Sequence, residues 1–169
     1  MLVASMNPCP CGYYNHPEKE CVCTGGVVQK YLNKISGPLL DRIDIHIEVI
    51  PVPFNKLSEQ NHVESSEAIR QRVSNARKIQ EERFNEKDNI YTNAQMTTKL
   101  LSQYCQIDKA GNNLLKNAMS KLGLSARAYD RIIKVSRTIA DLEGSQDIQP
   151  HHLAEAINYR SLDREDWAG

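Results

Sequence analysis

Two kinds of hydrophobic periodicity divide the chain at about residue 63. Over 43–49 an isoleucine or valine occupies each odd position, and Asp, His or Glu each even one. This alternation is typical of a half-buried strand. The opening MLVASM is apolar and stops at Asn7-Pro8, which predicts another strand near 1–7. Because two isolated strands do not make a stable sheet, we expect the chain to be a piece of a larger protein.

After that point the apolar positions recur every three or four residues, which predicts helices. Ser65 or Ser66 can cap a first helix, whose apolar stripe runs from Ile69 through Ala76 towards Phe84. A polar connector follows it over 85–92. Further helices are predicted over about 95–105, 108–122, 126–142 and 150–160.

Local signals mark the ends of these helices and lead to a fold class. Gly123 suits the end of one helix, Ser125 can cap the next, and Pro150 fits a first helical turn. The fold is therefore predicted to be mainly α with a small β part. Four units are predicted: a strand-containing segment with a Cys-rich insert over 1–62, a connecting helix and linker over 63–92, a helical bundle over 93–160 and a polar tail over 161–169.

Composition and charge change this picture little. The apolar fraction of 40% and the charged fraction of 25% are ordinary for a soluble globular protein. Neither a signal peptide nor an apolar stretch of the ~20 residues that cross a bilayer is evident, so we expect a cytoplasmic protein with no membrane partner. Net charge is zero, but 108–140 holds seven Lys or Arg against two Asp. This basic stretch is either a solvated helix face or a surface that meets phosphate.

Four cysteines form two close pairs, C-x-C and C-x-C, separated by nine residues: Cys9, Cys11, Cys21 and Cys23. Four thiolates can surround Zn²⁺ tetrahedrally, and a closed site of this kind is structural. The spacing within each pair is shorter than the usual C-x₂-C, so reduced thiols without metal and disulfides are the alternatives. His16 could replace one cysteine, whereas Cys105 lies on an apolar helix and is expected in the core.

No complete catalytic constellation is present in the sequence. It has no G-x-x-x-x-G-K-[ST] phosphate loop, G-x-G-x-x-G, H-E-x-x-H or G-x-S-x-G. His151 and His152 are adjacent on a predicted helix and so are expected to point to different faces, which makes a poor joint metal site.

Four strings taken together resemble the magnesium-chelatase-like AAA+ ATPases of the ComM/YifB type. They are MLVASMNPCPCGYY, ISGPLLDRIDIHIEV, LGLSARAYDRIIKVSRTIADLEG and HLAEAINYRSLDR, in order along essentially the whole chain. The resemblance implies that the first segment is the C-terminal piece of an AAA+ α/β core and that the helices after it form the lid. Walker A and Walker B segments lie upstream in that family, so we expect this chain to be inactive alone.

The resemblance gives two residues of the first segment catalytic roles. Asn7 matches the sensor-1 position, where an amide orients the attacking water near the γ-phosphate. On sequence alone an Asn-Pro turn is the alternative. Arg42 matches an arginine finger that stabilises charge on the nucleotide of a neighbouring subunit. The alternative for Arg42 is an ordinary ion pair with Asp41 or Asp44.

A third residue, Arg127, matches sensor 2 of the lid, an arginine that binds the γ-phosphate of ATP. It starts a predicted helix, whose N-terminus favours anions. Arg131 and Lys134 follow on the same face, so a solvated basic face is the alternative.

For the complete protein the resemblance implies ATP and Mg²⁺ as cofactors and a homo-oligomeric ring, with six subunits expected. It also implies DNA as a partner, in branch migration linked to competence and recombination. A different class of function remains open: a zinc-stabilised module that binds nucleic acid or protein and has no ATPase role. A third is a purely structural lid.

Overall fold

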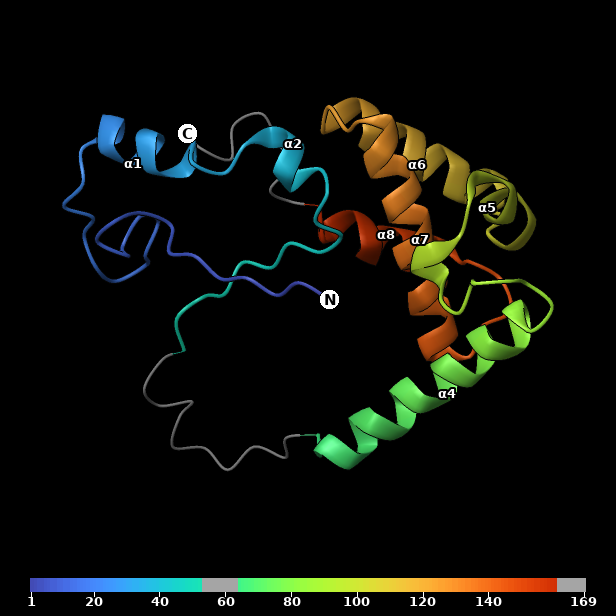
Figure 1. Ribbon diagram of the computed structural model, residues 1–169. Coiled ribbons are helices and arrows are strands. Elements are labelled where there is room, and N and C mark those ends of the chain that lie inside the picture. The colour runs from blue at the N-terminus through green and yellow to red at the C-terminus, as the bar shows by residue number, and fades with distance from the viewer. Residues whose placement is uncertain (53–63, 161–169) are drawn as a thin grey trace.

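The computed structural model describes residues 1–52 and 64–160 and is mainly helical, which confirms the fold class (Figure 1). The helices of the described residues, in chain order, are α1 (Gly25–Leu32), α2 (Gly37–Leu40), α4 (Ser66–Phe84), the 3₁₀ turn η1 (Asn93–Gln95), α5 (Thr98–Tyr104), α6 (Lys109–Lys121), α7 (Ala126–Glu143) and α8 (Pro150–Asn158). The helices from α4 onward lie within a few residues of their predicted bounds. The short helices α1 and α2 were not predicted.

Capping side chains set where the longer helices begin. Ser65 accepts a hydrogen bond from Ala68 N at the start of α4, and Asp108 and Ser125 do the same for α6 and α7. Gly144 closes α7 in the left-handed conformation, at φ 77°. Each of these signals is local in sequence, which is why the helix bounds could be predicted.

Helix α7 is the centre of the bundle and packs against α4, η1, α5 and α8, while α6 packs against α8. The buried apolar residues come from these elements and the loops between them: Phe84, Met96, Leu100, Leu101, Cys105, Leu115, Ile132, Ile133, Ile148, Leu153 and Ala156. Cys105 is in this core, as predicted. The apolar stripe of α4 is buried only towards its C-terminal end, since Ile69 and Val73 are more than 40% exposed.

A buried polar network ties α4 and η1 to α7. The Asp141 carboxylate is fully buried and accepts hydrogen bonds from Arg83, Asn93 and Arg137. Arg137 also donates to the Ser145 and Gln146 carbonyls after α7. Every side chain in the network therefore has partners, as burial of charge in a core requires.

The two predicted strands are not formed in the described residues. Segments 1–7 and 43–49 lack ladder partners, and the bridge found in the described part of the chain joins Ile107 to Ile148. Ile47 and Val49, which alternation places on a buried face, are 68% and 87% exposed. The physical reason is that a strand needs a neighbouring strand to satisfy its backbone groups. The predicted tail 161–169 lies outside the described residues.

Candidate metal centre and arginine sites

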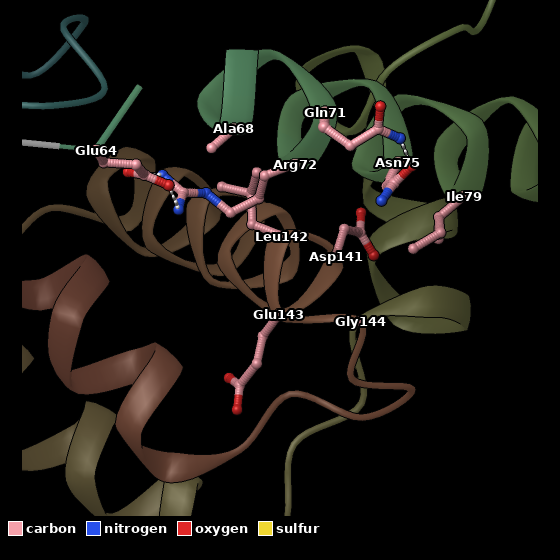
Figure 2. Close-up of a pocket in the computed structure, with 10 residues that line it drawn as sticks. All are labelled: Glu64, Ala68, Gln71, Arg72, Asn75, Ile79, Asp141, Leu142, Glu143 and Gly144. Carbon is pink, nitrogen blue, oxygen red and sulfur yellow. Dashed lines mark hydrogen bonds and ion pairs between the residues drawn. The ribbon is translucent and has the colours of Figure 1, made fainter. Parts of the chain in front are cut away.

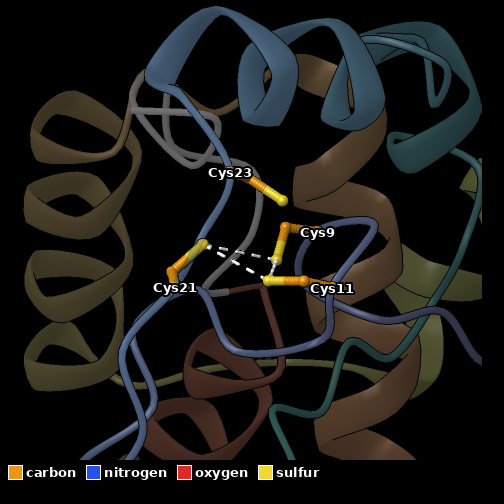
Figure 3. A group of neighbouring side chains, drawn as sticks. All are labelled: Cys9, Cys11, Cys21 and Cys23. Atoms are coloured by element: carbon orange, nitrogen blue, oxygen red, sulfur yellow. Dashed lines mark hydrogen bonds between the residues drawn. The ribbon is translucent and has the colours of Figure 1, made fainter.

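The four cysteines of the two pairs come together in the structure (Figure 3). The Sγ atoms of Cys9 and Cys11 lie 3.3 Å apart. The Sγ atom of Cys21 lies 3.7 Å from that of Cys9 and 3.6 Å from that of Cys11. All four sulfur atoms are within 4.8 Å of one another. Because a disulfide needs an S–S distance near 2.0 Å, these are free thiols and the disulfide alternative is wrong.

Backbone turns and the helix α1 shape this cysteine cluster. Gly12 N donates to Cys9 O at 3.0 Å, and Gly12 has φ +84°, a conformation that favours glycine. From the other side, Val28 and Leu32 of α1 are buried against the cysteines. A tight turn at Gly12 therefore follows the first cysteine pair, and α1 covers the cluster.

The geometry of the cysteine cluster fits a tetrahedral metal. With Zn–S bonds of about 2.3 Å, the sulfur atoms of a ZnS₄ site lie about 3.8 Å apart, close to the spacing of the thiols. His16 is not part of the group, since its Nδ1 accepts from Glu18 N and Lys19 N at 3.0 Å.

The thiols of the cluster differ in acidity. The backbone N–H of Tyr13 is the largest influence on Cys11 and lowers the pKa of its thiol to about 6. The backbone N–H of Cys23 lowers the pKa of Cys21, but burial and the adjacent thiols outweigh it and raise the pKa to about 12. The Cys11 thiol therefore ionises more readily than the Cys21 thiol, which would release its proton on metal binding.

Arg42 ends the turn after α2 and is exposed, and its Nη1 donates to Pro38 O at 2.7 Å. The two carboxylates expected to compete for it face elsewhere. Asp41 accepts from the hydroxyl of Ser125 at 2.9 and 3.0 Å, and Asp44 pairs with Arg131. Among the described residues, then, the ion-pair alternative for Arg42 has no support.

Arg127 occupies the first turn of α7 and is exposed. Within the described ranges it makes no hydrogen bond or ion pair, unlike Arg131 one turn later. Asn7 is also exposed, at the end of the extended opening segment. The segment that carries Arg42 is bonded to the start of α7, while no hydrogen bond joins Asn7 to either arginine in the described part of the chain.

Glu143 at the end of α7 and two histidines in the first turn of α8 form a group that was not expected. His151 and His152 do not diverge: both Nε2 atoms contact one carboxylate oxygen of Glu143, His151 at 2.9 Å. Glu143 hydrogen-bonds to His151 and His152, which lowers the pKa of its carboxyl group. However, Nδ1 of His152 accepts Gln149 N at 2.9 Å, so Nε2 carries the proton and donates to Glu143. In this tautomer His152 cannot offer Nε2 to a metal.

A shallow groove lies between α4 and the end of α7, and side chains of both helices face it (Figure 2). Asp141 contributes to its floor but is committed to Arg83 and Arg137. Arg72 pairs with Glu64, and Glu143 points away from α4. The groove therefore presents no set of convergent catalytic groups.

Comparisons with known proteins match two family descriptions to successive parts of the chain. Residues 1–57 match the family described as "Magnesium chelatase, subunit ChlI", and residues 63–160 match "Magnesium chelatase, subunit ChlI C-terminal". The chain is 42% identical over 164 residues to "Competence protein ComM" of Haemophilus influenzae. It is 41% identical over 165 residues to YifB of Escherichia coli strain K12, and 37% identical over 164 residues to YifB of Salmonella typhimurium.

Each of these matches covers 96% of this chain and 31% of the relative, so the chain spans about a third of the length of these curated relatives. None of the described helices is long and apolar enough to cross a membrane. The resemblance found in the four sequence strings is confirmed along nearly the whole chain. The chain belongs to the magnesium chelatase subunit ChlI family, in the branch that includes ComM and YifB.

Proposed function

We propose that this chain supplies arginine-finger and sensor residues to ATP hydrolysis by a magnesium-chelatase-related AAA+ ring. The observation that carries the proposal is Arg42, whose guanidinium is exposed while its acidic neighbours bind the helical bundle. An arginine held in this way is available to a phosphate on another subunit. Brought to a γ-phosphate, it stabilises the charge of the transition state.

Arg127 and Asn7 complete the proposed set. Arg127 is exposed on the first turn of α7, where the helix N-terminus adds partial positive charge beside any bound phosphate. Asn7 has the amide that sensor 1 requires to orient water. ATP and Mg²⁺ would be bound by the complete protein, which we propose forms a hexameric ring in the cytoplasm.

DNA is the proposed partner of this ring. One relative is named a competence protein, and the basic stretch 108–140 contains cations that α6 and α7 expose to solvent, among them Lys109, Lys116 and Lys121. A role in DNA processing such as branch migration would combine hydrolysis with movement along the strand. Electrostatic contact with phosphate predicts affinity that falls steeply with salt.

Zinc is the proposed structural ion of the cysteine cluster. The spacing of the four sulfurs supports it, and four protein ligands leave no open position for a substrate. Elemental analysis of the purified chain should give one zinc per molecule. A folded sample that is free of metal and fully reactive towards thiol reagents would contradict this assignment.

The ATPase proposal is tested in the full-length protein with Arg42→Ala. We expect hydrolysis to fall by about 10³-fold or more, as for other arginine fingers, with nucleotide binding retained. Arg70→Ala is the matched control, because Arg70 is an exposed arginine of α4 that pairs only with Glu67 among the described residues. Mixing Arg42→Ala subunits with subunits defective in nucleotide binding should restore activity if Arg42 acts in trans.

Wild-type hydrolysis by Arg42→Ala would defeat the ATPase role. The cysteine cluster would then favour the second candidate, a zinc-stabilised module that binds nucleic acid or protein without hydrolysis.

A further inference from the structure

Five contacts fasten the segment around Arg42 to the N-terminal part of α7 and the C-terminal end of α8. We name these residues the clamp: Asp41, Ile43, Asp44 and His46 on one side, Ser125, Arg131, Tyr159 and Arg160 on the other. The segments are far apart in sequence, so the contacts join the first region of the chain to the helical bundle. None of them involves the Arg42 side chain.

The first half of the clamp is built at the N-terminus of α7. The Ser125 hydroxyl accepts from Ala128 N at 3.1 Å as the helix cap and donates to Asp41 at 2.9 Å. The Asp41 carboxylate is also favoured by the positive end of the helix. Two turns into α7, Arg131 pairs with Asp44. The N-terminal cap and second turn of α7, on either side of the exposed Arg127, therefore bind both acidic neighbours of Arg42.

The second half is built at the end of α8. Arg160, which is fully buried, donates to the Ile43 carbonyl, and its Nη2 lies 3.8 Å from Asp41 Oδ1. His46 N donates to Tyr159 O at 2.8 Å, and the His46 side chain is buried. The main chain at Ile43 and His46, after Arg42, is therefore held in place. The side chains of Asp41 and Asp44, before and after Arg42, are held as well.

We propose that Asp41 and Asp44 are positioning residues that hold Arg42 and Arg127 in one fixed arrangement. Anchors at 41, 43, 44 and 46 leave Arg42 with little freedom of its main chain, while its side chain stays exposed. A movement of α7 is then transmitted to Arg42, so the two arginines reach or leave phosphate together. This positioning role rests on the ATPase role proposed above. It adds Asp41 and Asp44, which have no part in that ATPase role otherwise.

The test is a charge exchange across the clamp in the full-length protein. Asp44→Arg and Arg131→Asp should each lower kcat about tenfold with little change in KM for ATP, because an ångström-scale displacement of a catalytic group costs up to about a hundredfold. The double variant, which restores the pair with its polarity reversed, should recover most of the loss. The same exchange of Glu67 and Arg70, an exposed pair within α4, should leave kcat unchanged singly and together.

Hydrogen exchange on this chain separates the clamp from the ATPase role. The amide of His46, bonded to Tyr159 O, should lose protection at least severalfold in each single variant and regain it in the double variant. Unchanged protection in the single variants would overturn the clamp. Lost protection with parental kcat, while Arg42→Ala is inactive, would overturn the positioning role and leave the ATPase proposal standing. Parental ATPase activity in Arg42→Ala would overturn both the ATPase role and the positioning role. Hydrogen exchange at His46 would in that case still show whether the two sides of the clamp are in contact.

Discussion

The two described regions of the chain hold themselves together by different means. Residues 64–160 share one apolar core, drawn from α4, α5, α6, α7, α8 and their loops. Residues 1–52 have a cluster of only three buried residues, Cys9, Val28 and Leu32, with the remaining cluster cysteines packed around it. Small units with so little apolar burial usually need a metal or a disulfide. The difference indicates that the bundle folds through its core, while the first region depends on its sulfur site.

The clamp joins the two described regions. It consists of polar contacts, and of the apolar side chains along its first segment Leu40 is buried while Ile45 and Ile47 are 45% and 68% exposed. Polar contacts at a partly exposed interface contribute modestly to stability and strongly to geometry. The first region should therefore lose its order independently of the bundle.

The largest expected effect comes from removing the proposed zinc ion from the first region. Structural zinc sites contribute an apparent ~10–16 kcal/mol of binding free energy that is also folding free energy. Chelation, or Cys11→Ser, should therefore abolish protection of α1 amides in hydrogen exchange while the helical signal of 64–160 persists. Loss of both regions together would contradict the independence argued above.

Cys105 provides an internal control for that experiment. Burial is the largest influence on this thiol and raises its pKa to about 11, so it stays protonated and reacts slowly at neutral pH. Thiol reagent added after chelation should label four cysteines quickly and the fifth only on unfolding of the bundle.

The next largest effect is expected inside the bundle, at Asp141. Asp141→Asn removes the negative charge that Arg83 and Arg137 share and leaves Arg137, only 2% exposed, without the carboxylate that it pairs with among the described residues. Breaking a buried pair on one side costs about 3–5 kcal/mol of unfolding free energy. Urea denaturation monitored by circular dichroism measures this loss, and metal content should stay unchanged. Glu67→Gln, in an exposed pair of α4, should keep the parental midpoint.

The success of the predictions from sequence also differs between the two described regions. Helices α4 to α8 could be predicted because their apolar periodicity and caps are local, as Ser125 and Pro150 illustrate. The cysteine cluster could be predicted because its ligands lie within one short stretch. Helices α1 and α2 were missed because glycine or Gly-Pro opens each of them and a loop is the usual interpretation.

The contacts that sequence could not supply are the distant ones. Arg83 and Asp141 are 58 positions apart, and Asp44 and Arg131 are 87 apart. Charged residues at such separations have many candidate partners, and only the packing of the helices selects one. The strand expected at 43–49 failed for a related reason, since alternation predicts a face to bury but not the neighbour that covers it.

The smallest expected effect compares one substitution in both regions. In α6 a Cβ on Gly111 would lie 2.7 Å from Cδ1 of the buried Leu153 in α8. Alanine gains about 1 kcal/mol of helix propensity over glycine, but overpacking a core costs about 1–3 kcal/mol. Gly111→Ala should therefore lower the unfolding free energy of the bundle by up to about 2 kcal/mol. A Cβ on Gly26 of α1 meets no atom within 4 Å, so Gly26→Ala should leave α1 as protected as before or more so. A stabilised Gly111→Ala bundle would mean that α6 and α8 can separate without cost, and that the core is looser than the first comparison requires.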